Sequence, residues 1–131
     1  MATSKSTEWA LILGASSGFG AAAAIELARS GLNVFGVHLD LRSTLPNAQR
    51  VVAEIEGLGR EAVFFNRNAA DAAKRVAVVE SIRQKLQQQG DDAYVRVFMR
   101  SLAFGTLVPF IAENPKPVSY THLTLPTILL V

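Results

Sequence analysis

A glycine-rich segment near the start of the chain has the residue types that bind phosphate groups. It reads Gly14-Ala15-Ser16-Ser17-Gly18-Phe19-Gly20. The first glycine permits a sharp turn off a strand, the second lets backbone approach a pyrophosphate, and the third lets a helix pack closely on a sheet. The N-terminal dipole of that helix would face the phosphates. The spacing predicts a dinucleotide cradle, and the alternative is glycines that serve only the turns.

The segments around this motif alternate between predicted strands and predicted helices. A continuous apolar run predicts a strand over 9–13, and β-like runs predict strands over 33–39, 62–65 and 94–99. Helices are predicted over 20–30, ending at Gly31, over 47–56, and over 71–89. This order predicts a doubly wound α/β fold of the Rossmann type, with a parallel sheet in the order 3-2-1-4 and helices on both faces.

Two residues are expected to cap these helices, and a set of apolar residues is expected to form one face of the third. Asn47, after Pro46, is the predicted cap of the second helix, and Asp71 is the predicted cap of the third. The apolar residues at helical spacing in the third helix are Val76, Val78, Val79, Ile82 and Leu86.

Composition narrows the class of protein. The chain has 131 residues, of which 50% are hydrophobic and 18% charged, so it is predicted to fold as a domain. Its net charge of +2 comes from 13 basic and 11 acidic residues without a basic stripe, which argues against nucleic acid as a partner. The chain has no cysteine, which excludes thiolate metal sites and is compatible with a reducing cytoplasm. No metal site is predicted, and the apolar run 9–13 is too short to cross a membrane.

The spacing Gly-x-x-x-Gly-x-Gly, between a predicted strand and a predicted helix, resembles that of the short-chain dehydrogenase/reductase family. The resemblance extends from about Trp9 to about Pro115. It implies an oxidoreductase that transfers hydride between NAD or NADP and a carbonyl, an alcohol or an activated alkene. It also implies a small-molecule substrate and a homo-oligomeric parent protein. The family's diphosphate-binding role falls here on Gly14, Ser16, Ser17, Gly18, Phe19 and Gly20.

By the same resemblance, the residues after the second strand face the adenosine ribose. NAD-preferring members usually carry an acid where this chain has His38, while Asp40 lies two residues on and Arg42 four. An acid there accepts a hydrogen bond from a free 2′-hydroxyl and repels a 2′-phosphate, whereas Arg42 with Ser17 would hold the phosphate. The pattern slightly favours NADP and leaves NAD open. The alternative for His38 is a partly buried histidine without a ligand role.

Two later strand ends complete the expected cofactor site. Asn68 and Ala69 stand where the family typically has an acid that touches the adenine amino group, and the Asn68 carbonyl can accept the same hydrogen bond. Ser101 and Leu102 are expected beside the nicotinamide-side ribose. The stretch Arg100 to Gly105 resembles the His-Ser-Ile-Ala-Phe stretch of enoyl-acyl-carrier-protein reductases, which makes that branch an alternative.

The family's catalytic pair is not found in the sequence. Members place a tyrosine and, four residues later, a lysine well beyond the fourth strand. Here Tyr94 is followed at that spacing by Phe98, and Tyr120 by Thr124. No catalytic residue is therefore assigned, and the chain by itself is predicted to be inactive. A non-catalytic nucleotide-binding module is the alternative from another functional class.

The last residues have a different predicted origin. Segment 118–127, VSYTHLTLPT, resembles the conceptual translation of a transposase-based sequencing adapter, and the adjoining adapter bases fit Pro117 and Val131. We predict the N-terminal half of an NAD(P)-binding domain over 1–117 and a non-native tail over 118–131. The alternative is a genuine terminal strand over 123–131. A sheet cut off after its fourth strand would expose an edge, which predicts association.

Overall fold

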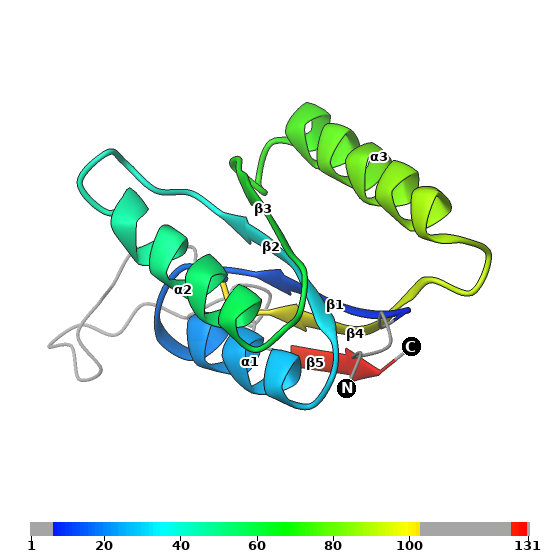
Figure 1. Ribbon diagram of the computed structural model, residues 1–131. Helices are drawn as coiled ribbons and strands as arrows, with labels where there is room; N and C mark the ends of the chain where they lie inside the picture. The colour runs from blue at the N-terminus through cyan, green and yellow to red at the C-terminus, as the bar shows by residue number, and fades with distance from the viewer. Residues whose placement is uncertain (1–6, 103–126, 131) are drawn as a thin grey trace, which may run out of the picture.

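The computed structural model describes residues 7–102 and the backbone of residues 127–130 (Figure 1). The elements in chain order are β1 (Glu8–Leu13), α1 (Gly18–Arg29), β2 (Asn33–His38), α2 (Leu45–Gly57), β3 (Ala62–Asn66), α3 (Ala72–Gln89), β4 (Tyr94–Arg100) and β5 (Thr127–Leu130).

The strands form one sheet in the order β3-β2-β1-β4-β5. β1 pairs in parallel with β2 and β4, and β2 pairs in parallel with β3. Helices α1 and α2 lie on one face of this sheet and α3 lies on the other (Figure 1). The predicted Rossmann-type fold and the order 3-2-1-4 are confirmed.

The continuous apolar sequence of β1 reflects a strand that is buried on both faces. Ile12 packs in the cluster under α1 and α2, whereas Trp9 packs in the cluster under α3. Trp9 is fully buried and its ring stacks on Phe35 of β2, with the two ring centroids 3.9 Å apart. Successive residues of a strand point to opposite faces, so one apolar run supplies both cores.

β2 is the most completely buried strand, since all six of its residues are buried. Gly36 in its centre lies opposite Phe64 of β3. A β-carbon on Gly36 would lie 2.7 Å from the Phe64 ring, so the glycine makes room for this aromatic side chain. The close packing fixes β3 against β2 and places the ends of the two strands side by side.

The structure shows which residues cap the starts of α2 and α3. α2 begins at Leu45 with Thr44 in the cap position, so the prediction of Asn47 as cap is wrong. Pro46 stands in the first turn, where the N–H that proline lacks would have no partner in the helix. The cap of α3 is confirmed, because the Asp71 side chain accepts a hydrogen bond of 3.2 Å from the Lys74 N–H.

α3 presents only part of its apolar sequence to the sheet. Val78 and Ile82 are buried against it, whereas Val76 and Val79, also expected on the buried side, are 69% and 60% exposed. An apolar groove of about 190 Å³ remains between α3 and the sheet, and Phe98 contributes to its lining.

β5 runs antiparallel to β4, with Val97 to Arg100 opposite residues 130 to 127. A strand near the end of the chain was the alternative expectation for the tail, and it forms over these four residues. The pairing leaves the origin of the tail as a prediction, because backbone pairing requires no particular side chains. Residues 103–126 and 131, which include most of the predicted tail and part of the Arg100–Gly105 stretch, lie outside the described residues.

Candidate functional site

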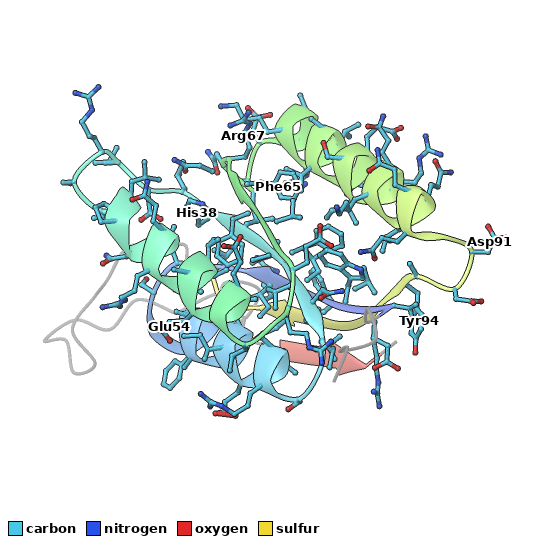
Figure 2. All side chains as sticks on the ribbon, viewed as in Figure 1. His38, Glu54, Phe65, Arg67, Asp91 and Tyr94 are labelled. Carbon is cyan, nitrogen blue, oxygen red and sulfur yellow. The ribbon has the colours of Figure 1, made fainter. Side chains whose placement is uncertain are left out.

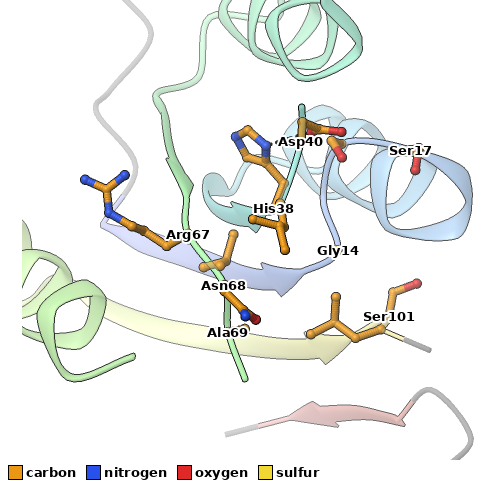
Figure 3. Close-up of a pocket in the computed structure, with 12 residues that line it drawn as sticks. Gly14, Ser17, His38, Asp40, Arg67, Asn68, Ala69 and Ser101 are labelled. Carbon is orange, nitrogen blue, oxygen red and sulfur yellow. Dashed lines mark hydrogen bonds and ion pairs between the residues drawn. The ribbon is translucent and has the colours of Figure 1, made fainter. Parts of the chain in front are cut away.

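A cleft of about 240 Å³ lies at the carboxyl edge of the sheet, where the parallel strands β1 to β4 end (Figure 3). In doubly wound folds this edge is where ligands bind. The lining residues come from four strand ends and are Gly14, Ser16, Ser17, Val37, His38, Leu39, Asp40, Arg67, Asn68, Ala69, Ser101 and Leu102.

The turn after β1 is tightly constrained by its glycines. Gly14 has a φ of +87°, and its N–H donates to the Val37 carbonyl of β2 over 2.8 Å. A β-carbon on Gly20 would lie 1.8 Å from the Gly14 carbonyl oxygen, so the first turn of α1 packs directly on the loop. The roles predicted for these two glycines, a sharp turn and close helix packing, are what the geometry requires.

Gly18 has a different environment. It is the first residue of α1 and has a φ of +57°. A β-carbon there would meet no atom of the described part of the chain within 4 Å. The preceding cap residue, Ser17, is extended and makes no side-chain hydrogen bond to the first turn of the helix. The start of α1 is therefore exposed, with the positive end of its dipole at the surface, and it follows Ser17, which lines the cleft.

A buried polar pair lies where β2 ends. The His38 Nδ1 atom is 2.8 Å from Oδ2 of Asp40, and their side chains are 4% and 11% exposed (Figure 3). The hydroxyl groups of Ser16 and Thr44 also lie near the Asp40 carboxyl group, and the Thr44 hydroxyl donates to the Leu41 carbonyl at 3.2 Å. Burial alone would raise the pKa of this carboxyl group. The three neighbouring polar groups outweigh burial and bring the pKa of Asp40 below its ordinary value of 3.8.

The end of β3 supports this pair through Asn66. The Asn66 Oδ1 atom accepts from the Asp40 N–H at 2.9 Å, and its Nδ2 donates to the Asp40 carbonyl at 3.1 Å. Asn68 lines the cleft, as expected, and its Oδ1 accepts from the Ala70 N–H at 3.0 Å. Since an amide oxygen has two lone pairs, Asn68 Oδ1 can accept a second hydrogen bond from a ligand donor.

The fourth strand end closes the cleft next to the glycine turn. The Ser101 N–H donates to the Leu13 carbonyl at 2.8 Å, which continues the β1–β4 pairing past the end of β4. Ser101 and Leu102 both line the cleft, where the sequence places them.

Four of the predicted site residues do not line the cleft, and three lining residues were not predicted. Phe19 is 82% exposed, and Arg42 is exposed in the loop before α2. The remaining two that do not line it are Gly18 and Gly20, and the unpredicted lining residues are Val37, Leu39 and Arg67. Arg67 directly follows β3, so the rule that strand ends meet at one edge was the signal that would have found it.

Among residues 7–102 and 127–130, no helix is long and apolar enough to cross a membrane.

The parallel order 3-2-1-4, the glycine turn and the cleft at the strand ends define a doubly wound α/β protein of the Rossmann type. The sequence profile described as short chain dehydrogenase matches residues 8–90. The chain therefore belongs to the short-chain dehydrogenase family, and the resemblance seen in the sequence is confirmed.

Solved structures of this family are similar to the chain. A metagenomic short-chain oxidoreductase in complex with NADP is 26% identical, with a TM-score of 0.56, over 65% of this chain and 37% of that one. A blue fluorescent protein from a metagenomic library, in complex with NADPH, is 30% identical, with a TM-score of 0.56, over 60% of this chain and 32% of that one.

Carveol dehydrogenase from Mycobacterium avium, in complex with NAD, shares the fold at 23% identity, with a TM-score of 0.54, over 61% of this chain and 32% of its own. This chain thus spans between 32% and 37% of these three proteins. No curated protein sequence matches it.

Proposed function

We propose that the cleft binds NAD or NADP, with the diphosphate at the start of α1 and the adenosine end near His38, Asp40 and Asn68. The observation that carries this proposal is the open side of Gly18. Its backbone conformation favours glycine, and no atom of residues 7–102 lies within 4 Å of the place that a β-carbon would take. A phosphate group placed there would meet the N-terminal end of the α1 dipole.

The reaction is proposed from the family to which the chain belongs. A bound nicotinamide supplies or accepts the hydride, and the partner substrate is a carbonyl, an alcohol or an activated alkene. The chain's own residues bind and orient the nucleotide, while the catalytic tyrosine and lysine belong to a part of the parent that this sequence does not contain. The matched profile is the general short-chain dehydrogenase one, which does not favour the enoyl-reductase alternative.

The proposal also includes a cytoplasmic location and a homo-oligomeric state for the parent protein. A cysteine-free chain is suited to a reducing cytoplasm. A homo-oligomeric parent is proposed from the family alone.

A matched pair of glycine variants tests nucleotide binding. Gly18→Ala places a methyl group on the open side of the turn, and we expect it to weaken binding of both NAD and NADP at least about tenfold. Gly59→Ala is the control, because Gly59 also has a positive φ, +78°, and a β-carbon there would meet none of the described residues within 4 Å. Gly59 lies beyond α2 and does not line the cleft.

Both substitutions strain the backbone by about 1 kcal/mol, so their stabilities should match while their affinities differ. Isothermal titration calorimetry gives the affinities. Equal affinities for the two variants, or no binding of either nucleotide by the unsubstituted chain, would refute the proposed function.

A further inference from the structure

The apolar groove beside α3 has no part in the proposed function. It has a volume of about 190 Å³ and lies between this helix and the face of the sheet. None of the described residues that line it is acidic. The apolar part of the lining comes from β1, β4 and α3, and includes Leu11, Leu13, Phe98, Val78, Val79 and Ile82.

The C-terminal end of α3 is tied to the sheet by hydrogen bonds. The Trp9 Nε1–H donates to Gln89 Oε1 at 2.7 Å, and Gln89 Nε2 donates to Glu61 Oε2 at 2.9 Å. Of the described residues of α3, only Val78 and Ile82 are buried. The helix is therefore fixed at this end and packs on the sheet along a narrow line, beside which the groove remains.

The other end of the groove is cationic. Arg67 follows β3, and Lys74 and Arg75 stand in the first turn of α3. Figure 2 shows Arg67 beside the start of this helix. Within residues 7–102 and 127–130, none of the three cations forms an ion pair. Asp71, the acid nearest to them in the sequence, caps the helix through the Lys74 N–H and does not line the groove.

Arg75 is held in a position that suits a carboxylate. Its Nη1 donates to the Ala69 and Ala70 carbonyl groups, at 2.9 Å and 3.1 Å. Nη1 uses both of its protons in these bonds, whereas Nε and Nη2 have no acceptor among the described residues. These two groups form the edge of a guanidinium that binds both oxygens of a carboxylate.

The groove follows α3 for about two turns. Lys74, Val78 and Ile82 succeed one another at intervals of four residues on one face of the helix, and span about 12 Å at about 1.5 Å per residue. An extended chain advances about 1.2 Å per bond. An apolar slot of this length with cations at one end fits an alkyl chain of about eight to ten carbons that ends in an anion.

We propose that the groove is a binding site for a medium-chain carboxylate, whose anionic end meets Arg67, Lys74 and Arg75 and whose alkyl chain lies along α3. Arg67 and Asn68 line both cavities, so the site adjoins the nucleotide cleft. Lys74, Arg75 and Val79 line the groove alone, so they distinguish the two sites. The inference does not depend on the proposed function.

Isothermal titration calorimetry of the 131-residue chain with sodium octanoate, without nucleotide, tests this site. Because the alkyl chain is buried, affinity should rise about fourfold for each methylene group added from hexanoate to nonanoate. Octanol, which has the chain without the charge, should bind at least about threefold more weakly than octanoate.

Three charge variants test the cationic end. Arg75→Gln and Lys74→Gln should each weaken octanoate binding at least about threefold and leave octanol binding unchanged. The Lys74 side chain makes no hydrogen bond with the described residues, so its substitution removes the charge and no structural contact. Arg83→Gln is the matched control, because Arg83 is exposed on the same helix, pairs with Glu80 and does not line the groove.

Two valine variants test the apolar side. Val76 and Val79 are both exposed on α3, but only Val79 lines the groove. Val79→Gln should weaken the binding of octanoate and octanol alike, at least about threefold, whereas Val76→Gln should change neither.

Three results would overturn the site. The first is no binding of octanoate, including the case in which light scattering shows a dimer whose second copy covers the groove. The second is an affinity that does not vary with chain length, and the third is an equal loss in Arg75→Gln, Lys74→Gln and Arg83→Gln. The fluorescence of Trp9, the single tryptophan and fully buried, verifies that each variant is folded.

Discussion

Gly14 and Ser101 touch across the carboxyl edge of the sheet, although 87 positions separate them in the sequence. A β-carbon on Gly14 would lie 2.2 Å from the Ser101 carbonyl oxygen. The contact joins the end of β1 to the end of β4 and leaves no room for any other residue at position 14. The glycine that opens the phosphate loop is therefore also a packing residue of the sheet.

Gly14→Ala should destabilise the fold by about 3 kcal/mol, because it adds a steric clash with backbone to the strain of a positive φ. Urea denaturation followed by the fluorescence of Trp9 measures the free energy of unfolding. Gly59→Ala, which has the strain without the clash, should cost only about 1 kcal/mol. Equal losses for the two variants would contradict the Gly14–Ser101 contact.

The surroundings of the Asp40 carboxyl group predict how the free energy of unfolding depends on pH. The folded-state pKa of Asp40 is lowered, so its contribution is present above the unfolded value of about 3.9 and is lost as pH falls through the folded value. Asp40→Asn should therefore be less stable than the parent sequence at neutral pH, by about 1 kcal/mol or more. The difference in unfolding free energy should shrink below about pH 4. Urea melts across this range test it, and a difference that does not vary with pH would rule it out.

The 131-residue chain should bind nucleotide without turning it over. Neither Tyr94 nor Tyr120 has a lysine four residues later, so the proton transfer at the substrate oxygen has no donor pair. The absorbance of NADH and NADPH, monitored with simple aldehydes, ketones and enones, should stay constant. Sustained oxidation of either cofactor by the purified chain would contradict the missing-site interpretation.

Removal of residues 118–131 should promote self-association. β5 covers the edge of β4 from Val97 to Arg100, and without it these backbone groups have no partner strand. We expect the shortened chain to elute as larger species than the parent sequence, as measured by size-exclusion chromatography with light scattering. A monomer of the shortened chain at the same concentration would show that the edge needs no cover.

Apolar runs and helix caps predicted much of the fold, because both depend on residues that are close together in the sequence. The apolar run at β1 and the Asp71 cap depend on neighbours in the sequence, and both are where the pattern puts them. The Asn47 prediction was wrong because proline is accepted in the first turn, which let the helix begin earlier, at Leu45. Val76 was placed on the buried face by spacing alone, but one layer of sheet covers only a narrow stripe of α3.

The site was less predictable where it depends on contacts between strands. Asp40 could be identified in the sequence as an acid after the second strand, but the hydrogen bonds of its backbone to the Asn66 side chain join segments that only the folded chain brings together. The sequence alone does not distinguish Arg42 from Arg67 as a residue of the cleft. In the structure, Arg42 lies in the loop before α2 and does not line the cleft, whereas Arg67 follows β3 and lines it.

The hydrogen bonds between Asp40 and Asn66 have a further consequence for how the molecule assembles. They join the segment after β2 to the end of β3, so they exist only after the crossover through α2 has formed. A nucleotide bound at this edge, as we propose, would have no counterpart site in the unfolded chain. It would therefore stabilise the folded chain by an amount that grows with the ratio of its concentration to its dissociation constant.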